Sequence, residues 1–376
     1  MKKQFQPLST FSIRRFDFLL VTMVILLNLI GTAAIRSANP SYMTRQVYGM
    51  LSGIAIMFVL SAIDYRKLVN LGWLYYLACI AVLLLVIRFG EGRDQARRWI
   101  TIAGIRFQPA ETAKLLLILF YAKFIMRHKN KAKSFGFLLI CIAIAAIPFY
   151  LIYKQPDLST SIMVLVIIAV ILFVSEVLSY RLVGSFLLIS VPSVIIFIYV
   201  AIQEGATILE EFQKNRLLAW LHPEEYALTT AMQTMNSMMA IGSGQLLGKG
   251  YNTKEITSLL STGYISESQT DFIFTVVGEE FGFAGACSVV ALLAFISVRC
   301  FMTARTADFP GRIIASGMGA WIGFQGFMNI GVVTGVLPNT GIPLPFVSYG
   351  LTSLWALYMG IGLVLNVRMQ NRPKAA

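Results

Sequence analysis

The length of the apolar runs restricts this chain to one kind of fold. A helix needs roughly 20 predominantly apolar residues to cross a hydrocarbon core about 30 Å thick. Runs of about this length recur along the chain, at residues 16–35, 46–63, 71–87, 109–126, 135–153, 158–177, 182–202, 271–298, 313–336 and 346–367. They predict an all-α, polytopic integral membrane protein with about ten transmembrane helices, organised as a single domain over residues 1–376.

The balance of apolar and charged residues agrees with this prediction. Of the 376 residues, 57% are hydrophobic and 13% are charged, whereas a soluble domain carries about 25% charged residues. So few charged side chains cannot cover a water-facing surface of this size. The surplus apolar surface must therefore face lipid.

Basic residues orient the predicted helices in the membrane. They gather before the first span and after every second one, and loops rich in lysine and arginine mark the cytoplasmic side. With ten spans both termini are cytoplasmic. The net charge of +13 does not indicate nucleic acid binding, because these residues are dispersed rather than clustered on one face. They are Lys2, Lys3, Arg14, Arg15, Arg66, Lys67, Arg127, Lys129, Lys131, Lys133, Arg181, Arg299, Arg305, Arg312, Arg368, Arg372 and Lys374.

One arginine-rich segment lies on the unfavoured side. The loop between the third and fourth spans is expected outside, yet it contains Arg88, Arg93, Arg97, Arg98 and Arg106. Arginine suits phosphate because its planar fork makes bidentate contacts, so the loop is a candidate anion site. The alternative is an ordinary surface, partly neutralised by the acidic residues of the same loop.

A long polar segment at residues 203–270 is also expected outside. Loops longer than about 15 residues with little structure are usually functional or disordered. This one is not of low complexity, and it contains two weakly amphipathic stretches with apolar side chains such as Trp220 and Met235. We interpret it as a large extracellular loop that caps a site.

Polar residues inside the apolar runs are the next candidates, because a charge at membrane depth costs about 2.5–3.5 kcal/mol. Glu111 and Lys114 open the fourth span three residues apart, on one helix face. Asp271 begins the eighth span, and Gln325 and Asn329 share a face of the ninth. The alternative for these residues is structural hydrogen bonding between helices. Glu279 and Glu280 follow Asp271 within the eighth span.

Four segments together resemble one known family. Residues 338–350, Pro-Asn-Thr-Gly-Ile-Pro-Leu-Pro-Phe-Val-Ser-Tyr-Gly, resemble the long signature of the SEDS family (shape, elongation, division and sporulation). Residues 98–114, 155–160 and 270–282 match further family motifs in order. Small departures leave the subfamily open, whether elongation, division or sporulation. They are Ala110, Met232, Asn236, Gln269, Leu351 and Thr352.

The resemblance implies a ten-helix peptidoglycan glycosyltransferase that polymerises lipid II on the outer face of the cytoplasmic membrane. Such enzymes work beside a class B penicillin-binding protein, which supplies transpeptidation. The essential aspartate of the family falls on Asp271, and its important glutamate and lysine fall on Glu111 and Lys114. The matched motifs add Gln108, Asp157 and Ser348 as substrate-binding candidates.

The chemistry implied by this family suggests roles for the charged residues. A general base must take the proton of the attacking sugar hydroxyl, and Asp271 suits this role. Cations must stabilise the pyrophosphate leaving group, for which Arg98, Lys114 and Arg216 are the candidates. Glu111 either orients Lys114 or joins Asp271 in holding a divalent cation, Mg²⁺ or Mn²⁺, as a Lewis acid.

The proline-rich part of the signature predicts unusual backbone. Three prolines in residues 338–345 restrict the chain there. We expect a rigid re-entrant loop, which is tolerated at membrane depth only where protein or a polar cavity satisfies its backbone groups.

Two other functions stay open from the residues alone. Ten spans with intramembrane charges also describe a lipid flippase or transporter, although no inverted repeat is evident. A non-catalytic scaffold for cell-wall synthesis is the second alternative, because small-residue pairs such as Gly278/Gly282 favour helix contacts.

Overall fold

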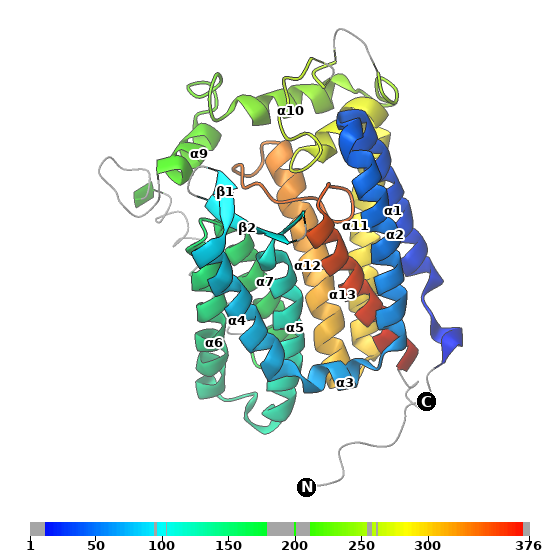
Figure 1. Ribbon diagram of the computed structural model, residues 1–376, viewed down its shortest axis with the longest axis vertical. Coiled ribbons are helices and arrows are strands. Elements are labelled where there is room, and N and C mark those ends of the chain that lie inside the picture. Colours follow the sequence, from blue (N-terminus) through cyan, green and yellow to red (C-terminus); the bar gives the residue numbers. More distant parts are fainter. Residues whose placement is uncertain are drawn as a thin grey trace.

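The fold is a bundle of long helices with a cap across one end (Figure 1). The computed structural model describes residues 12–93, 96–102, 104–178, 199–200, 211–253, 258–260 and 262–370. A small sheet and two short helices lie across the capped end. At the opposite, open end α1 and α12 begin and α11 and α13 end.

Within the described residues, long helices coincide with nine of the ten expected spans. The expected span 182–202 lies outside them apart from residues 199–200. Of the helices in the described residues, six are long and apolar enough to cross a membrane, namely α1, α2, α4, α6, α11 and α13, which confirms a multi-pass membrane protein. The nine helices are α1 (Phe18–Ala38), α2 (Pro40–Ala62), α4 (Gly72–Phe89), α5 (Pro109–Arg127), α6 (Phe135–Tyr153), α7 (Leu158–Val174), α11 (Ile273–Thr306), α12 (Phe309–Val333) and α13 (Leu351–Gln370).

Several helix starts follow from local capping. A side-chain oxygen that accepts a main-chain N–H of the first turn satisfies a group with no partner inside the helix. Asp17 accepts from Leu20 N at 3.2 Å, and Asp157 accepts from Thr160 N at 3.1 Å. Asp308 caps α12 in the same way, with Pro310 in its first turn. These boundaries are therefore set by nearby residues.

The helices differ in how much of their surface faces outward. α12 packs against α5, α7 and α11, while α13 packs against α2, and most residues of α12 and α13 are buried. The outer helices α4 and α6 expose large apolar side chains such as Leu74, Leu77, Phe135 and Ile140. Apolar residues on an outer face suit contact with lipid tails rather than water.

The segment between α4 and α5 contains a small antiparallel sheet that the all-α prediction did not include. Its strands are β1 (Glu91–Arg93), β2 (Ala96–Ile102) and β3 (Ile105–Phe107), in the order β1-β2-β3. Ile100 pairs with Phe107, and Gly104 has φ +78° at the turn between β2 and β3. The sequence did not predict these strands because they are too short to give a clear pattern.

The cap is built mainly from two helices, α9 (Glu211–Leu221) and α10 (Met232–Ser243). They correspond to the two weakly amphipathic stretches of the 203–270 segment. α10 packs against α11 and α12. Three short helical elements complete the described chain: η1 (Ile13–Arg15), α3 (Tyr65–Asn70) and η2 (Lys129–Lys131).

The chain after α10 is fastened to a break in α11. Gly282 has φ +64° inside that helix, and the freed N–H groups of Phe283 and Ala284 donate to Gln245 O at 2.8 Å and Leu246 O at 3.1 Å. Glu279 accepts from Lys249 Nζ at 2.9 Å and from Leu259 N at 3.0 Å. Glu280 accepts from Asn252 N at 3.1 Å. The two carboxylates therefore anchor the cap to α11.

Candidate functional site

Asp271 lies at the capped end, in the turn two residues before α11 begins. The loop between α12 and α13 passes directly beside it, and residues 338–345 of that loop are called the signature loop below. A Cβ placed on Gly341 would stand 3.1 Å from Asp271 Oδ2, and Gly341 has φ +67°. The absence of a side chain at 341 allows the loop backbone to approach the carboxylate.

Hydrogen bonds from neighbouring helices hold the signature loop. These bonds satisfy carbonyls that a non-helical segment inside a bundle would otherwise leave without partners. Ser159 Oγ donates to Thr340 O (2.8 Å), Asn329 Nδ2 to Ile342 O (2.7 Å) and Gln325 Nε2 to Pro343 O (2.8 Å). Within the same interhelix segment, Ser348 Oγ accepts from Leu344 N (2.7 Å).

Glu111 and Lys114 form a buried ion pair at the start of α5. Lys114 Nζ lies 2.6 Å from Glu111 Oε1, and the two side chains are 1% and 2% exposed. The ammonium also donates to Gln325 Oε1 at 2.9 Å and lies 4.6 Å from the centre of the Trp321 ring. Ser353 Oγ donates to Glu111 Oε2 at 2.7 Å. Every polar atom of the pair is thus engaged by protein.

The contacts of Glu111 bear on the two roles expected for it, orienting Lys114 or binding a metal. Both of its carboxylate oxygens are already bound, one by Lys114 and the other by Ser353. Among the described residues, no group of three or more His, Cys, Asp and Glu side chains lies together so that it could hold a metal ion. These contacts favour the role of a residue that orients Lys114, and a divalent cation held by Glu111 and Asp271 stays a prediction.

Arg98 and Asp157 meet where β2 approaches the start of α7. Arg98 Nη1 lies 3.9 Å from Asp157 Oδ2, and Arg98 Nε donates to Gln155 O at 3.3 Å. A further hydrogen bond joins the guanidinium to Pro156 O. Since Asp157 also caps α7, this helix start fixes the arginine at the capped end.

Arg216 on α9 brings the cap into the same cluster of charges. Burial lowers the pKa of Arg216, Arg98 acts in the same direction, and the carboxylates of Asp271 and Asp157 oppose them. Burial likewise raises the pKa of Asp271 to about 6, with Glu267 adding to the rise and Arg216 and Arg98 opposing it. Four predicted site residues, from four separate segments, therefore act on one another electrostatically.

Gln108 and Ser348 have contacts within the protein. Gln108 N donates to Thr352 Oγ1 at 3.3 Å, which joins the start of α5 to the start of α13. The hydroxyl of Ser348 donates to Thr270 O at 2.6 Å, beside Asp271. Ser348 thus couples the signature loop to the segment that carries the carboxylate. Direct substrate binding by these two residues stays a prediction.

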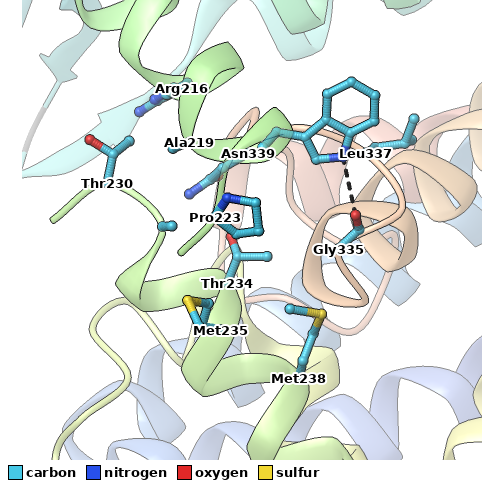
Figure 2. Close-up of a pocket in the computed structure, with 12 residues that line it drawn as sticks. Arg216, Ala219, Pro223, Thr230, Thr234, Met235, Met238, Gly335, Leu337 and Asn339 are labelled. Atoms are coloured by element: carbon cyan, nitrogen blue, oxygen red, sulfur yellow. Dashed lines mark hydrogen bonds between the residues drawn. The ribbon is translucent and has the colours of Figure 1, made fainter. Parts of the chain in front are cut away.

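A pocket opens between the cap and the end of α12 (Figure 2). The Trp220 indole N–H donates to Gly335 O at 3.1 Å, which attaches α9 to the chain after α12. The empty volume, including the part open to solvent, is about 430 Å³. Arg216 and Asn339 both line it, so the pocket adjoins the charged cluster and the signature loop. Its other walls are Ala219, Trp220, Pro223, Thr230, Ala231, Thr234, Met235, Met238, Gly335 and Leu337.

Some contributors to this arrangement were not singled out as site residues from the sequence. Ser159 and Gly341 fall inside matched motifs, but their contacts connect segments far apart in the chain. Gln325 and Asn329 were recognisable as amides on one face of an apolar helix, yet structural hydrogen bonding was an equal alternative. Their partners in the signature loop became evident only from the folded chain.

Comparisons with known proteins match the chain over nearly its full length. The family model for FtsW, RodA and SpoVE, described as cell cycle protein, matches residues 9–373. The probable peptidoglycan glycosyltransferase FtsW of Geobacter metallireducens is 31% identical, covering 96% of this chain and 97% of the relative. The peptidoglycan glycosyltransferase MrdB of Escherichia coli K12 is 35% identical, covering 88% of this chain and 86% of the relative.

Two solved structures share the fold over almost the whole chain. One, from a study of a peptidoglycan synthase complex that coordinates polymerisation and crosslinking, has a TM-score of 0.76 at 28% identity, covering 94% of this chain and 97% of its own. The rod shape determining protein RodA of Thermus thermophilus has a TM-score of 0.68 at 26% identity, covering 96% of this chain and 98% of its own.

Proposed function

Because the chain belongs to the FtsW/RodA/SpoVE family of cell cycle proteins, we propose that it is a peptidoglycan glycosyltransferase that polymerises lipid II, with Asp271 as the general base. The observation that carries the residue assignment is the close approach of the signature loop to Asp271, where a Cβ on Gly341 would stand 3.1 Å from Oδ2. This approach places the carboxylate beside the most specific motif of the chain, within electrostatic reach of two arginines.

The proposed reaction is one glycosyl transfer. Asp271 takes the proton of the attacking sugar hydroxyl while the new C–O bond forms at the anomeric carbon of the donor. The bond from that carbon to undecaprenyl pyrophosphate breaks, and its electron pair leaves with the pyrophosphate. A carboxylate with a pKa of about 6 is ionised at neutral pH and still close enough to the operating pH to accept a proton effectively.

Arg98 and Arg216 are the residues we assign to the leaving group. Negative charge develops on the pyrophosphate in the transition state, and fixed cations lower its energy. The two guanidinium groups act on the same carboxylate from β2 and from α9, so the leaving group would lie between the bundle and the cap. We assign the sugar units of lipid II to the adjoining pocket at Trp220 and Asn339.

Lys114 has a less direct part in this proposal. Its ammonium is 1% exposed and bound to Glu111 and Gln325, so it does not reach a substrate in this arrangement. Its positive charge supports the site from within the bundle. Glu111 keeps that charge oriented.

The capped end faces the outside of the cell in this proposal, and both termini are cytoplasmic. Support comes from the open end, where Arg66 pairs with Asp308 at 3.0 Å and Arg299 pairs with Asp17 at 2.7 Å. Basic residues at that end obey the positive-inside rule. We further propose a class B penicillin-binding protein as partner, supported by the structural likeness to a chain of a peptidoglycan synthase complex.

The test is polymerisation of lipid II by the purified chain in liposomes. We expect glycan chains to form without a second protein, and Asp271→Asn to make little product. Transfer of lipid II between leaflets without glycan formation would instead indicate a flippase. Neither transfer nor polymerisation by the folded chain would indicate a scaffold.

A further inference from the structure

We propose that Asn329 and Gln325 on α12 are positioning residues: their two amides hold the signature loop and Asp271 together and connect them to the Lys114–Glu111 pair. This inference rests on the proposed function for its kinetic consequences. The geometric part stands independently of any activity.

Asn329 binds both the Asp271 segment and the signature loop through one nitrogen. Its Nδ2 donates to Asp271 O at 2.7 Å and to Ile342 O at 2.7 Å. An amide NH₂ group has two hydrogens, so one goes to each carbonyl. The side chain is 1% exposed, which excludes water as a substitute donor. Asn329 therefore ties the Asp271 segment directly to the signature loop, beside the bond from Ser348 Oγ to Thr270 O.

Gln325 lies one turn earlier on the same face of α12. Its Nε2 donates to Pro343 O at 2.8 Å, so the two amides hold successive carbonyls of the loop. Its Oε1 accepts from Lys114 Nζ at 2.9 Å and from Trp321 Nε1 at 2.6 Å. An amide is required at this position because the residue must donate on one side and accept on the other.

These contacts connect the buried ion pair to the catalytic carboxylate. Glu111 orients Lys114, Lys114 binds Gln325, and Gln325 holds Pro343. Pro343 lies two residues after Gly341, where the loop passes beside Asp271. Removing the ion pair would thus displace the loop, and any effect on the substrate would follow from that displacement. The Lys114–Glu111 pair acts on Asp271 through α12 and the loop.

The kinetic test compares Asn329 with a matched asparagine at the open end. Asn366 is 0% exposed, its Nδ2 donates to Ser61 O at 2.6 Å and its Oδ1 accepts from Tyr65 N at 3.0 Å. A misplacement of about 1 Å at a reacting group can cost about 10²-fold in rate. We expect Asn329→Leu to lower kcat for lipid II polymerisation about tenfold to 10²-fold with little change in KM. Asn366→Leu should lower Tm by a similar amount but keep kcat per folded enzyme.

A second measurement needs no activity. A cysteine at Asn339, in a Cys287→Ser background, reports the looseness of the loop through its rate of labelling by a membrane-impermeant maleimide. We expect Asn329→Leu to raise that rate several-fold and Asn366→Leu to leave it unchanged. Gln325→Glu keeps the size and the acceptor oxygen but loses the donor to Pro343 O, so it should raise the rate as well. Gln325→Glu also allows the labelling measurement to be made if Asn329→Leu does not fold.

The two measurements separate the inference from the proposed function. Faster labelling in the α12 variants, together with a wild type that makes no glycan, would support the loop-holding role and remove the proposed function. Unchanged labelling in both α12 variants would overturn the inference, whatever the activity. Equal kcat losses in Asn329→Leu and Asn366→Leu would also overturn it, because the effect would then be one of general stability.

Discussion

Asp271 Oδ2 faces Gly341 so closely that a Cβ at position 341 would stand 3.1 Å from it, and Gly341 holds φ at +67°. The two residues lie 70 positions apart in the chain (341 − 271). Their proximity joins the candidate base to the signature loop.

Gly341→Ala should lower the rate of lipid II polymerisation about tenfold or more. A non-glycine residue at positive φ costs about 1–3 kcal/mol, and the added methyl group crowds the carboxylate. Gly242→Ala is the matched control, because a Cβ at 242 meets nothing within 4 Å. The measurement is kcat together with Tm, and full activity of Gly341→Ala would show that the close approach is unimportant.

Asp271→Asn should lower kcat by about 10²–10⁴, the usual contribution of a general base, while the protein stays folded. Asp64→Asn provides the control, since Asp64 caps α3 by accepting from Arg66 N at 2.9 Å and lies at the open end. Glycan formation is measured with equal amounts of folded protein. Near wild-type polymerisation by Asp271→Asn would remove the catalytic assignment.

The pH profile should reveal the raised pKa of Asp271. With that pKa at about 6, kcat/KM should fall as the pH drops below about 6, because protonation removes the base. Glu267 raises this pKa and Arg216 lowers it. Glu267→Gln should therefore move the acidic limb to lower pH, and Arg216→Met should move it to higher pH. The exposed Glu224 is the control position, where Glu224→Gln should leave the acidic limb of the pH profile unchanged. Shifts of the same sign in Glu267→Gln and Arg216→Met would contradict the assignment.

Lys114→Ala should reduce both stability and activity, because it leaves the Glu111 carboxylate buried without its ion-pair partner. Breaking a buried pair by removing one partner costs about 3–5 kcal/mol. The double variant Lys114→Met/Glu111→Gln should recover much of the lost Tm while remaining slow. If the double variant is fully active, the ion pair is a structural feature alone.

Cysteine labelling should place the cap outside the cell. Leu228 is 91% exposed on the cap, and Lys131 is exposed in η2 between α5 and α6. A membrane-impermeant reagent applied to intact cells should modify Leu228→Cys and spare Lys131→Cys. Lys254, another position of the cap segment, lies outside the described residues. The opposite labelling pattern would reverse the orientation.

The sequence alone determined the helices of the bundle and indicated Asp271 as the candidate base. Apolar runs of membrane-spanning length coincide with nine helices of the described chain, because backbone groups in lipid must be satisfied within each helix. Local caps such as Asp157 set several boundaries. The signature at 338–350 and the motif at 270–282 indicated Asp271 because both are specific to one family.

Only the tertiary structure decided what the other polar residues do. Lys114 turned out to be bound inside the bundle, and Glu279 to anchor the cap through Lys249, Leu259 and Leu260. The sheet at 91–107 and the amide contacts of Asn329 were likewise not predictable. Helix formation depends on residues a few positions apart, whereas the partner of a buried polar group depends on which distant segment packs beside it, and periodicity along the chain does not contain that information.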